Sequence, residues 1–277
     1  MTLTTDASHS GWDVVCDGVS SSGLWSSKEQ AIHINWLELF AVLFGVKCFV
    51  HLHNCLVKVL CGNSTAVAYI NNFGGMVPSL RAVSKSIWEW CFAHHFMLEA
   101  VHIPGSSNLQ ADSLSRQYNR NLEWKVHPAV LKWISQSLFV PNIDLFVSRL
   151  NSQTSVYVSW CPDPGAWAVD AFSFCWREFK PYIFPPFSLL GIILMKLKVE
   201  EVSDALVIVS WWPTAHWYPP LLQMRLAVWH VFGITYRSEE FLQGHPAMCS
   251  SHGVQGQKSS IQRLGNVFVT GVIGNPL

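Results

Sequence analysis

Charged residues are scarce in this chain of 277 residues. Lys, Arg, Asp and Glu make up 13% of it, whereas globular proteins carry about 25%. The 18 basic and 18 acidic side chains cancel, so a strong nonspecific attraction to nucleic acid cannot come from net charge. Such an attraction would need a local group of basic residues. The candidates are Lys47, Arg81, Lys85 and Arg116. The alternative is that these are ordinary solvated side chains.

Paired cysteines, a signal peptide and long apolar runs are also missing. None of the eight cysteines forms a Cys-x-x-Cys pair, and most lie in apolar runs, as buried free thiols do in a reducing compartment. The polar N-terminus has no signal-peptide core. The longest apolar run, residues 189–197, contains Lys196 and is too short to span a bilayer. We therefore expect an intracellular protein of the cytoplasm or nucleus that is not secreted and has no membrane partner.

Hydrophobic residues, in contrast, make up half of the chain, and 14 of them are Trp. This composition fits a large apolar core, or surfaces that once met neighbours in a larger polyprotein. The length suits two modest domains.

The first 120 residues alternate between strand and helix patterns. Asp17-Gly18 marks a turn between the second and third strands, and Asn35 and Ser64 are suitable helix N-caps. The expected strands cover residues 3–7, 11–16, 18–25, 56–60 and 97–103, and the expected helices 36–50, 65–71, 78–95 and 109–115. This order predicts an α/β domain with a mixed five-stranded sheet and flanking helices.

The rest of the chain is expected to form three further segments. Residues 121–140 are a linker and a helix. Residues 141–237 alternate again and predict a smaller Rossmann-like α/β unit. Residues 238–277 are rich in Gly and Ser and are expected to be poorly ordered, with the short apolar run 267–273 as the exception.

Three acidic residues of the first domain fall where they can converge at one end of the sheet. Asp6 ends the first strand, Glu38 lies one turn into the first long helix, and Asp112 begins the last helix. Converging carboxylates can bind two divalent cations that promote hydrolysis of a phosphodiester. Such an open acidic cluster suits Mg²⁺.

The sequence around these acids is more specific than the acids themselves. Four motifs resemble the ribonuclease H domain of retroelement reverse transcriptases, and most closely the DIRS and Ngaro type of retrotransposon. The motifs are Thr5-Asp6-Ala7-Ser8, Trp36-Leu37-Glu38-Leu39, Cys61-Gly62-Asn63-Ser64 and Ala111-Asp112-Ser113-Leu114-Ser115-Arg116. The resemblance implies a ribonuclease H-like fold that once followed a reverse transcriptase domain. It also implies cleavage of RNA in RNA–DNA hybrids, with Asp6, Glu38 and Asp112 as catalytic ligands of Mg²⁺ or Mn²⁺.

The same resemblance suggests substrate-binding residues. Asn63 and Ser64 would lie beside the scissile phosphate. Asn35 would reach the minor groove, where 2′-hydroxyls distinguish RNA from DNA, or it serves only as a helix cap. Asn108 would orient the loop before Asp112, or it is a turn-forming residue.

The first domain departs from the family pattern at two places. Gly62 stands where the family has a third aspartate. Mutation of a residue that only supports a metal ligand typically lowers metal affinity or activity by about 10–100-fold. The loss of a ligand itself therefore predicts severely reduced activity. Asp13 and Asp17 belong to the second strand and its turn, and we do not expect them to compensate. The loop 104–108 also lacks the His that some ribonucleases H carry there.

A second set of motifs resembles the Dam-like adenine-N6 methyltransferase segment of DIRS-type elements. It comprises Asp144-Leu145-Phe146, Asp170-Ala171-Phe172, Trp176, Phe184-Pro185-Pro186-Phe187 and Trp211-Trp212-Pro213. In that family a polar residue precedes Pro-Pro and holds the target amino group. Here that position is Phe184, which cannot accept a hydrogen bond, although Phe187 could stack on a flipped base. Asp144 or Asp170 could once have met the cofactor. Without a Gly-rich cofactor loop we do not expect S-adenosylmethionine to bind, and an inert packing domain is the alternative.

The sequence thus leaves several functions open. The first is a weakened hybrid-specific endonuclease. The second is a non-catalytic remnant of a retrotransposon polyprotein that binds nucleic acid weakly or is inert. A degenerate DNA methyltransferase and a module that binds a partner through exposed Trp are the others.

Overall fold

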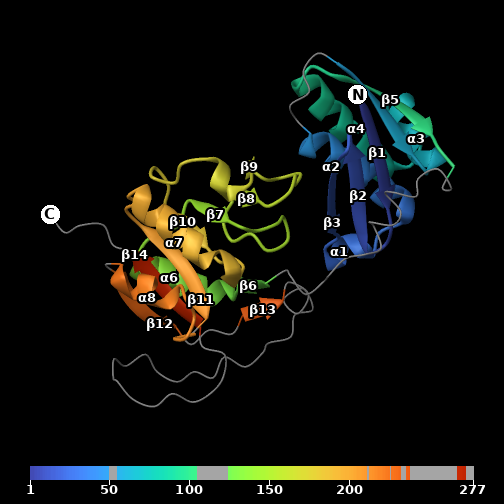
Figure 1. The fold of residues 1–277 in the computed structure, drawn as a ribbon. Coiled ribbons are helices and arrows are strands. Elements are labelled where there is room, and N and C mark those ends of the chain that lie inside the picture. The colour runs from blue at the N-terminus through green and yellow to red at the C-terminus, as the bar shows by residue number, and fades with distance from the viewer. Residues whose placement is uncertain are drawn as a thin grey trace. The chain divides into compact units, whose positions relative to one another are not determined.

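A computed structural model describes residues 1–49, 55–104, 124–210, 212–224, 226–231, 235–237 and 267–272. The chain forms two compact units (Figure 1). The first comprises Met1–Arg120 together with Cys161–Ala166, and the second comprises Asn121–Trp160 and Trp167–Leu277.

The first unit is built on a mixed five-stranded sheet of order β3-β2-β1-β4-β5. The first three strands pair antiparallel, whereas β1, β4 and β5 run parallel. The strands are β1 (Thr2–Ala7), β2 (Gly11–Cys16), β3 (Val19–Leu24), β4 (Leu56–Cys61) and β5 (Met97–His102). Asp17 and Gly18 have φ of 46° and 85°, the positive values that a two-residue hairpin turn requires. The predicted sheet and turn are confirmed.

Four helices of the first unit lie in the described residues. They are α1 (Ser27–Gln30), α2 (Ile34–Cys48), α3 (Ser64–Asn71) and α4 (Pro78–Ala93). Helix α2 lies so close to the sheet that a Cβ built on Gly45 would be 3.0 Å from the side chains of Leu3 and Val14. These two residues therefore mark the sheet face that α2 covers, and neighbouring strand residues such as Asp6 and Asp13 project to the other face.

Both predicted helix caps are wrong by one or two residues. His33 caps α2, and its Nδ1 accepts a hydrogen bond from the Asn35 backbone N–H at 3.2 Å. Asn63 caps α3, and its Oδ1 accepts from the Ala66 N–H at 3.0 Å. Because an N-cap has extended backbone angles and a side-chain acceptor, Asn35 and Ser64 instead lie inside their helices.

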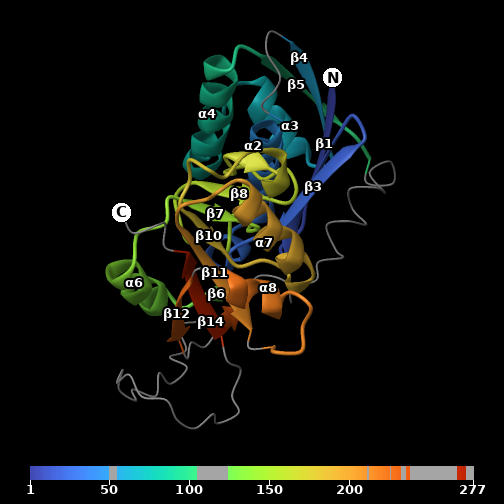
Figure 2. The ribbon, with the colours of Figure 1, turned by 60° about the vertical axis from the view of Figure 1, so that its left-hand side comes forward.

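The second unit contains a seven-stranded sheet of order β12-β14-β11-β10-β7-β8-β9 (Figure 2). The strands from β11 to β9 are parallel, whereas β14 runs antiparallel to both of its neighbours. They are β7 (Ile143–Leu145), β8 (Tyr157–Ser159), β9 (Ala168–Val169), β10 (Pro181–Ile183), β11 (Ala205–Ser210), β12 (Leu226–Val231) and β14 (Val267–Val272). A separate pair joins β6 (Trp124–Val126) to β13 (Thr235–Arg237).

Helices pack on both faces of this second sheet. Ile183 and Val207 lie in the cluster that contains residues of α7 (Leu190–Val199). Tyr182 and Leu206, their chain neighbours, lie in the cluster that contains residues of α6 (Pro128–Ser137). A further helix, α8 (Tyr218–Gln223), follows β11. The unit is α/β as predicted, but its sheet has seven strands against five in the first unit, so it is not the smaller one.

The tail is described only in part. Val267–Val272, the apolar run that the sequence set apart, forms β14 between β11 and β12. Residues 238–266 and 273–277, the remainder of the predicted tail, lie outside the described residues.

Candidate active site

Two of the three predicted acidic ligands lie near one another in the first unit. Asp6 is the penultimate residue of β1, and Glu38 lies on the second turn of α2. Glu38 is 7% exposed. Burial raises its pKa to about 8, the negative charge of Asp6 adds to the rise, and a hydrogen bond from Cys61 offsets part of it. The two carboxylates therefore act on each other electrostatically. Asp112, the third predicted ligand, and Asn108 lie outside the described residues.

Gly62 leaves open space beside Asp6. It follows Cys61, the last residue of β4, whose Cα partner on β1 is Thr5, so it comes next to Asp6 in the parallel register. A Cβ built at Gly62 would meet nothing within 4 Å. A β-carbon at this position would therefore not displace any of the described neighbours.

His102 is a neighbour of Gly62 that the sequence motifs did not indicate. Its Nε2 lies 3.2 Å from the Gly62 carbonyl oxygen. The pairing of Cys61 with His102 across β4 and β5 explains this proximity. An alignment of the two predicted parallel strands could have revealed it.

A second overlooked residue, Cys61, helps to fix Glu38. The Cys61 thiol donates to Glu38 Oε2 at 3.9 Å, and its sulfur accepts from the Asn63 N–H at 3.4 Å. Burial raises the pKa of Cys61 to about 12, so at neutral pH the group is a thiol that can donate. The motif placed Cys61 in the site but did not indicate this contact.

Asn35 and Asn63 are joined directly. Asn63 Nδ2 donates to Asn35 Oδ1 at 2.9 Å, which links the N-terminal turns of α2 and α3. Ser64, the first residue of α3, is exposed. These three predicted substrate-binding residues thus lie at two adjacent helix N-termini, which suit anionic ligands.

Asp13 lies closer to Asp6 than its place in the sequence indicated. The two are Cα partners in the antiparallel pair of β1 and β2, and the Asp13 side chain is 0% exposed. Burial raises the pKa of Asp13 to about 8, the Val14 backbone N–H offsets part of the rise, and the charge of Asp6 adds to it. Asp13 was set aside because it belongs to the second strand, but the strand register puts it directly opposite the candidate ligand.

The donor chemistry of this region suits a divalent cation. Carboxylate oxygens are the ligands that Mg²⁺ and Mn²⁺ prefer. Neither oxygen of the buried Asp13 carboxyl has a partner in hydrogen-bond geometry, so the Val14 N–H acts on this carboxyl only as a weaker electrostatic neighbour. No three His, Cys, Asp or Glu side chains within the described ranges form a ready metal-binding group. A complete set would therefore need a ligand from elsewhere, such as Asp112.

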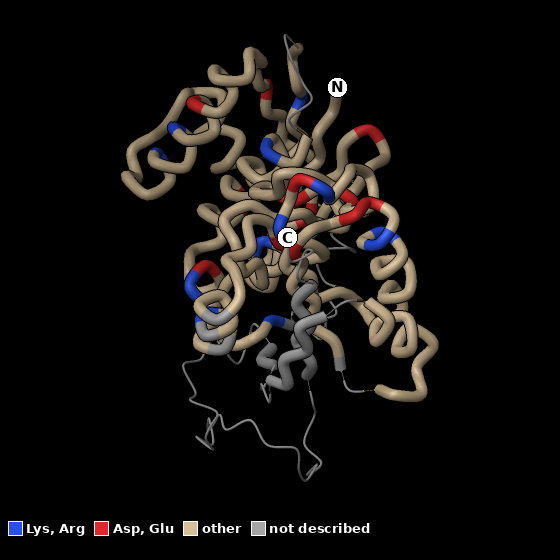
Figure 3. The backbone as a smooth tube through the Cα atoms, turned by 90° about the vertical axis from the view of Figure 1, so that its left-hand side faces the viewer, with Lys and Arg blue, Asp and Glu red and all other residues tan. Residues whose placement is uncertain are grey.

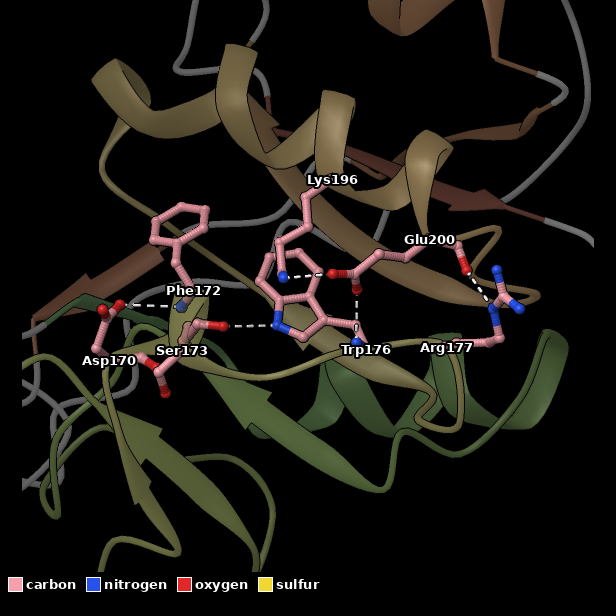
Figure 4. Close-up of polar contacts among 8 residues, drawn as sticks. Asp170, Phe172, Ser173, Trp176, Arg177, Lys196 and Glu200 are labelled. Atoms are coloured by element: carbon pink, nitrogen blue, oxygen red, sulfur yellow. Dashed lines mark hydrogen bonds and ion pairs between the residues drawn. The ribbon is translucent and has the colours of Figure 1, made fainter.

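The acidic and aromatic motifs of the second unit have structural roles (Figure 4). The Asp170 carboxylate accepts from the Phe172 N–H at 2.9 Å and caps the short 3₁₀ helix Ala171–Ser173. The buried Trp176 donates its indole N–H to the Ala171 carbonyl at 2.7 Å, and the Lys196 ammonium lies 5.1 Å from the centre of its ring. Glu200 accepts from the Trp176 backbone N–H at 2.6 Å.

The Pro-Pro motif follows β10, the central strand of the seven-stranded sheet. Phe184 packs against the cluster that contains Tyr182 and Leu206, whereas Phe187 is 38% exposed. Asp144, in the neighbouring strand β7, is fully buried and accepts from the Gln153 N–H at 2.6 Å. Trp211 lies outside the described residues, and Trp212 is exposed.

Two further observations concern the charged residues of the described chain and the length of its apolar helices. Basic and acidic residues are interspersed along the described chain (Figure 3). Among the helices of the described part, none combines the length and apolarity needed to cross a bilayer.

No protein-family model matches the chain, and no curated protein matches it. Among solved structures, the chain is similar to a ribonuclease H1 from the halophilic archaeon Halobacterium salinarum NRC-1. The two share 16% identity with a TM-score of 0.33, over 41% of this chain and 92% of that one.

Proposed function

We propose that residues 1–120 form a ribonuclease H-like nuclease module that binds RNA–DNA hybrids and cleaves their RNA strand inefficiently. One observation carries the proposal. Glu38 on α2 contacts Cys61, whose partner on β1 is Thr5, the residue before Asp6, so a helix and a strand that are 32 positions apart in the sequence bring two acids to the end of a mixed five-stranded sheet. The sequence motifs around both acids support the same assignment.

Asp6, Glu38 and Asp112 would hold Mg²⁺ or Mn²⁺, and the bound cations would activate water and stabilise the leaving oxygen. The other residues position these groups and the substrate. Cys61 holds the Glu38 carboxyl through its thiol. The Asn63 side chain is held by two hydrogen bonds, one from the Ala66 N–H that it caps and one to Asn35. The N-terminal end of α3 can then face a phosphate of the hybrid.

The missing carboxylate at position 62 accounts for the inefficiency. Glycine offers no ligand atom beside Asp6. Because a Cβ at position 62 meets none of the described residues, the defect should be reversible by a single substitution to aspartate.

The test compares the full chain with its Gly62→Asp variant on a labelled RNA–DNA hybrid in Mg²⁺ and in Mn²⁺. We expect Gly62→Asp to raise the cleavage rate by about 100-fold or more, and Gly62→Ala, which adds no ligand, to leave it unchanged. In the Gly62→Asp background, Asp6→Asn should abolish the gain. No gain from Gly62→Asp would contradict the proposal. Hybrid binding without cleavage by either protein would favour the non-catalytic alternative.

We also propose that this chain derives from a retrotransposon polyprotein of the DIRS or Ngaro type, with a reverse transcriptase domain as a former neighbour. The proposal rests on the sequence motifs. We place its activity inside the cell, in the cytoplasm or nucleus.

A degenerate adenine-N6 methyltransferase is the second candidate, and the strand order of the second unit favours it. Taken in chain order, its five parallel strands are arranged 3-2-1-4-5, the doubly wound order whose ligands bind where the order reverses. Here that point lies between β7 and β10, beside the Pro-Pro motif. Phe184 packs into a hydrophobic cluster and has no group to hold an amino group. We therefore expect no transfer from labelled S-adenosylmethionine to adenine in DNA, and detectable transfer would revise this assignment.

A further inference from the structure

Hydrogen bonds hold the short segment that joins β4 to α3, which consists of Cys61, Gly62 and Asn63. The Cys61 carbonyl accepts from the Ile103 N–H at 3.1 Å, and the Asn63 N–H donates to the Cys61 sulfur at 3.4 Å. The Asn63 side chain caps α3 and reaches Asn35. These contacts fix the residues before and after Gly62, but none of them involves the Gly62 carbonyl.

Gly62 is the residue of this segment that most needs support. Glycine has no Cβ, so its backbone adopts more conformations than that of any other residue. The space around it is open as well, since a Cβ at position 62 would meet none of the described residues within 4 Å. Side-chain packing therefore contributes nothing to the orientation of its peptide group, which has to be fixed by hydrogen bonds.

His102 supplies such a hydrogen bond from the neighbouring strand. It is the last residue of β5 and the Cα partner of Cys61, and its Nε2 lies 3.2 Å from the Gly62 carbonyl oxygen. Because a carbonyl oxygen can only accept, Nε2 carries the proton in this contact. The imidazole is exposed, so core packing does not account for a histidine at this position.

We propose that His102 is a positioning residue, which holds the Gly62 peptide group and thereby keeps position 62 and the N-terminus of α3 in a fixed orientation beside Asp6. The inference rests on the proposed function, because it assumes that this end of the sheet is the reactive one. A displacement of about 1 Å in a group that positions the reactants can lower a rate by about 100-fold. The contact therefore matters more for the reaction than for the stability of the fold, to which one exposed hydrogen bond contributes little.

The first experiment measures cleavage of a labelled RNA–DNA hybrid by the full chain in the Gly62→Asp background. We expect His102→Ala to lower kcat by about 10-fold and to leave KM for the hybrid nearly unchanged, because the orientation of position 62 affects the chemical step and not hybrid binding. The side-chain amide of His102→Gln can donate to the same carbonyl, so this variant should recover most of the rate.

His95 provides a matched control. It is an exposed histidine just before the start of β5, and its φ of 58° is one that asparagine tolerates. We expect His95→Asn to cleave like its Gly62→Asp parent. Melting curves verify that each variant folds.

The pH profile separates positioning from proton transfer by His102. The neutral imidazole with its proton on Nε2 and the imidazolium both donate from Nε2. If His102 only positions, the ratio of the rates of His102→Gln and its parent should stay constant between about pH 5 and pH 8, the range in which an imidazole changes its charge. A ratio that varies with pH would show that the charge or the proton of the imidazole takes part, which contradicts the inference.

Hydrogen exchange tests the same contact without relying on cleavage. The amides of Ala66 and Val67 donate to Asn63, so their protection reports on how firmly the start of α3 is held. In the natural chain we expect His102→Ala to accelerate their exchange several-fold, and His102→Gln and His95→Asn to leave it unchanged.

Two further results would overturn the inference. If His102→Ala exchanges and cleaves like its parent, the contact positions nothing, and the proposed function stands without it. If His102→Ala loses activity that His102→Gln does not restore, the imidazole acts in another way. Should Gly62→Asp cleave no hybrid, the nuclease proposal fails, and the exchange measurement alone decides whether His102 holds the start of α3.

Discussion

Asn35 and Asn63 connect the two helices that border the candidate site. Asn63 donates from Nδ2 to Asn35 Oδ1 at 2.9 Å while its own Oδ1 caps α3. One side chain therefore fixes both the start of a helix and the distance to its neighbour.

This arrangement predicts unequal effects for two alanine substitutions. Asn63→Ala removes the cap and the link and should cost about 1–2 kcal/mol of unfolding free energy. Asn35→Ala removes the link alone and should cost about 0.5–1.5 kcal/mol. Urea denaturation of both variants and of the double variant measures the coupling. Strict additivity would mean that the hydrogen bond contributes nothing.

Two glycines of the first unit should respond differently to a methyl group. A Cβ at Gly75 would lie 2.4 Å from Cζ of Tyr69, whereas one at Gly62 would meet nothing within 4 Å. We expect Gly75→Ala to cost about 1–3 kcal/mol, as overpacking does, and Gly62→Ala to change stability by less than about 0.5 kcal/mol. Thermal unfolding compares them. A large loss from Gly62→Ala would show that position 62 cannot receive an aspartate freely.

Local patterns in the sequence predict much of this fold, and long-range pairing accounts for what they miss. The alternation of apolar and polar residues and the Asp17-Gly18 turn depend only on neighbouring positions in the sequence. The strands and the hairpin can therefore be predicted from them. The cap of α2 was missed because the His33 ring nitrogen performs a role that propensity assigns to Asn35. Asp13 was set aside because its significance depends on register with Asp6. That register depends on pairing between strands, which no single motif encodes.

Cys61 should be chemically inert in the folded protein. It is 0% exposed, and burial raises its pKa to about 12, so the reactive thiolate is rare at neutral pH. Brief treatment with iodoacetamide followed by mass spectrometry should label the exposed Cys175 well before Cys61. Equal labelling of the two would mean that the site opens readily to solvent, which would also weaken the contact with Glu38.

Asp144 should make the second unit less stable as pH rises. Burial raises its pKa well above the usual value, and the Gln153 N–H and the charge of Lys125 offset only part of the rise. The folded carboxyl thus keeps its proton at a pH where the unfolded one, with a pKa of about 3.9, has lost it. Because the folded state binds more protons, the contribution of Asp144 to the free energy of unfolding is fully present below the pKa of the unfolded carboxyl. This contribution declines as the pH increases above that value.

The substitution Asp144→Asn removes this titration while keeping an oxygen that can accept from Gln153, so it tests the prediction directly. Amide protection of β7, measured by hydrogen exchange and normalised to the intrinsic rate at each pH, should fall between pH 5 and pH 8 in the natural chain. It should fall much less in Asp144→Asn, while Glu178→Gln, a change at an exposed acid, should behave like the natural chain. Parallel loss of protection in all three proteins would assign the pH dependence to other groups, because only Asp144→Asn removes a buried carboxyl from this sheet.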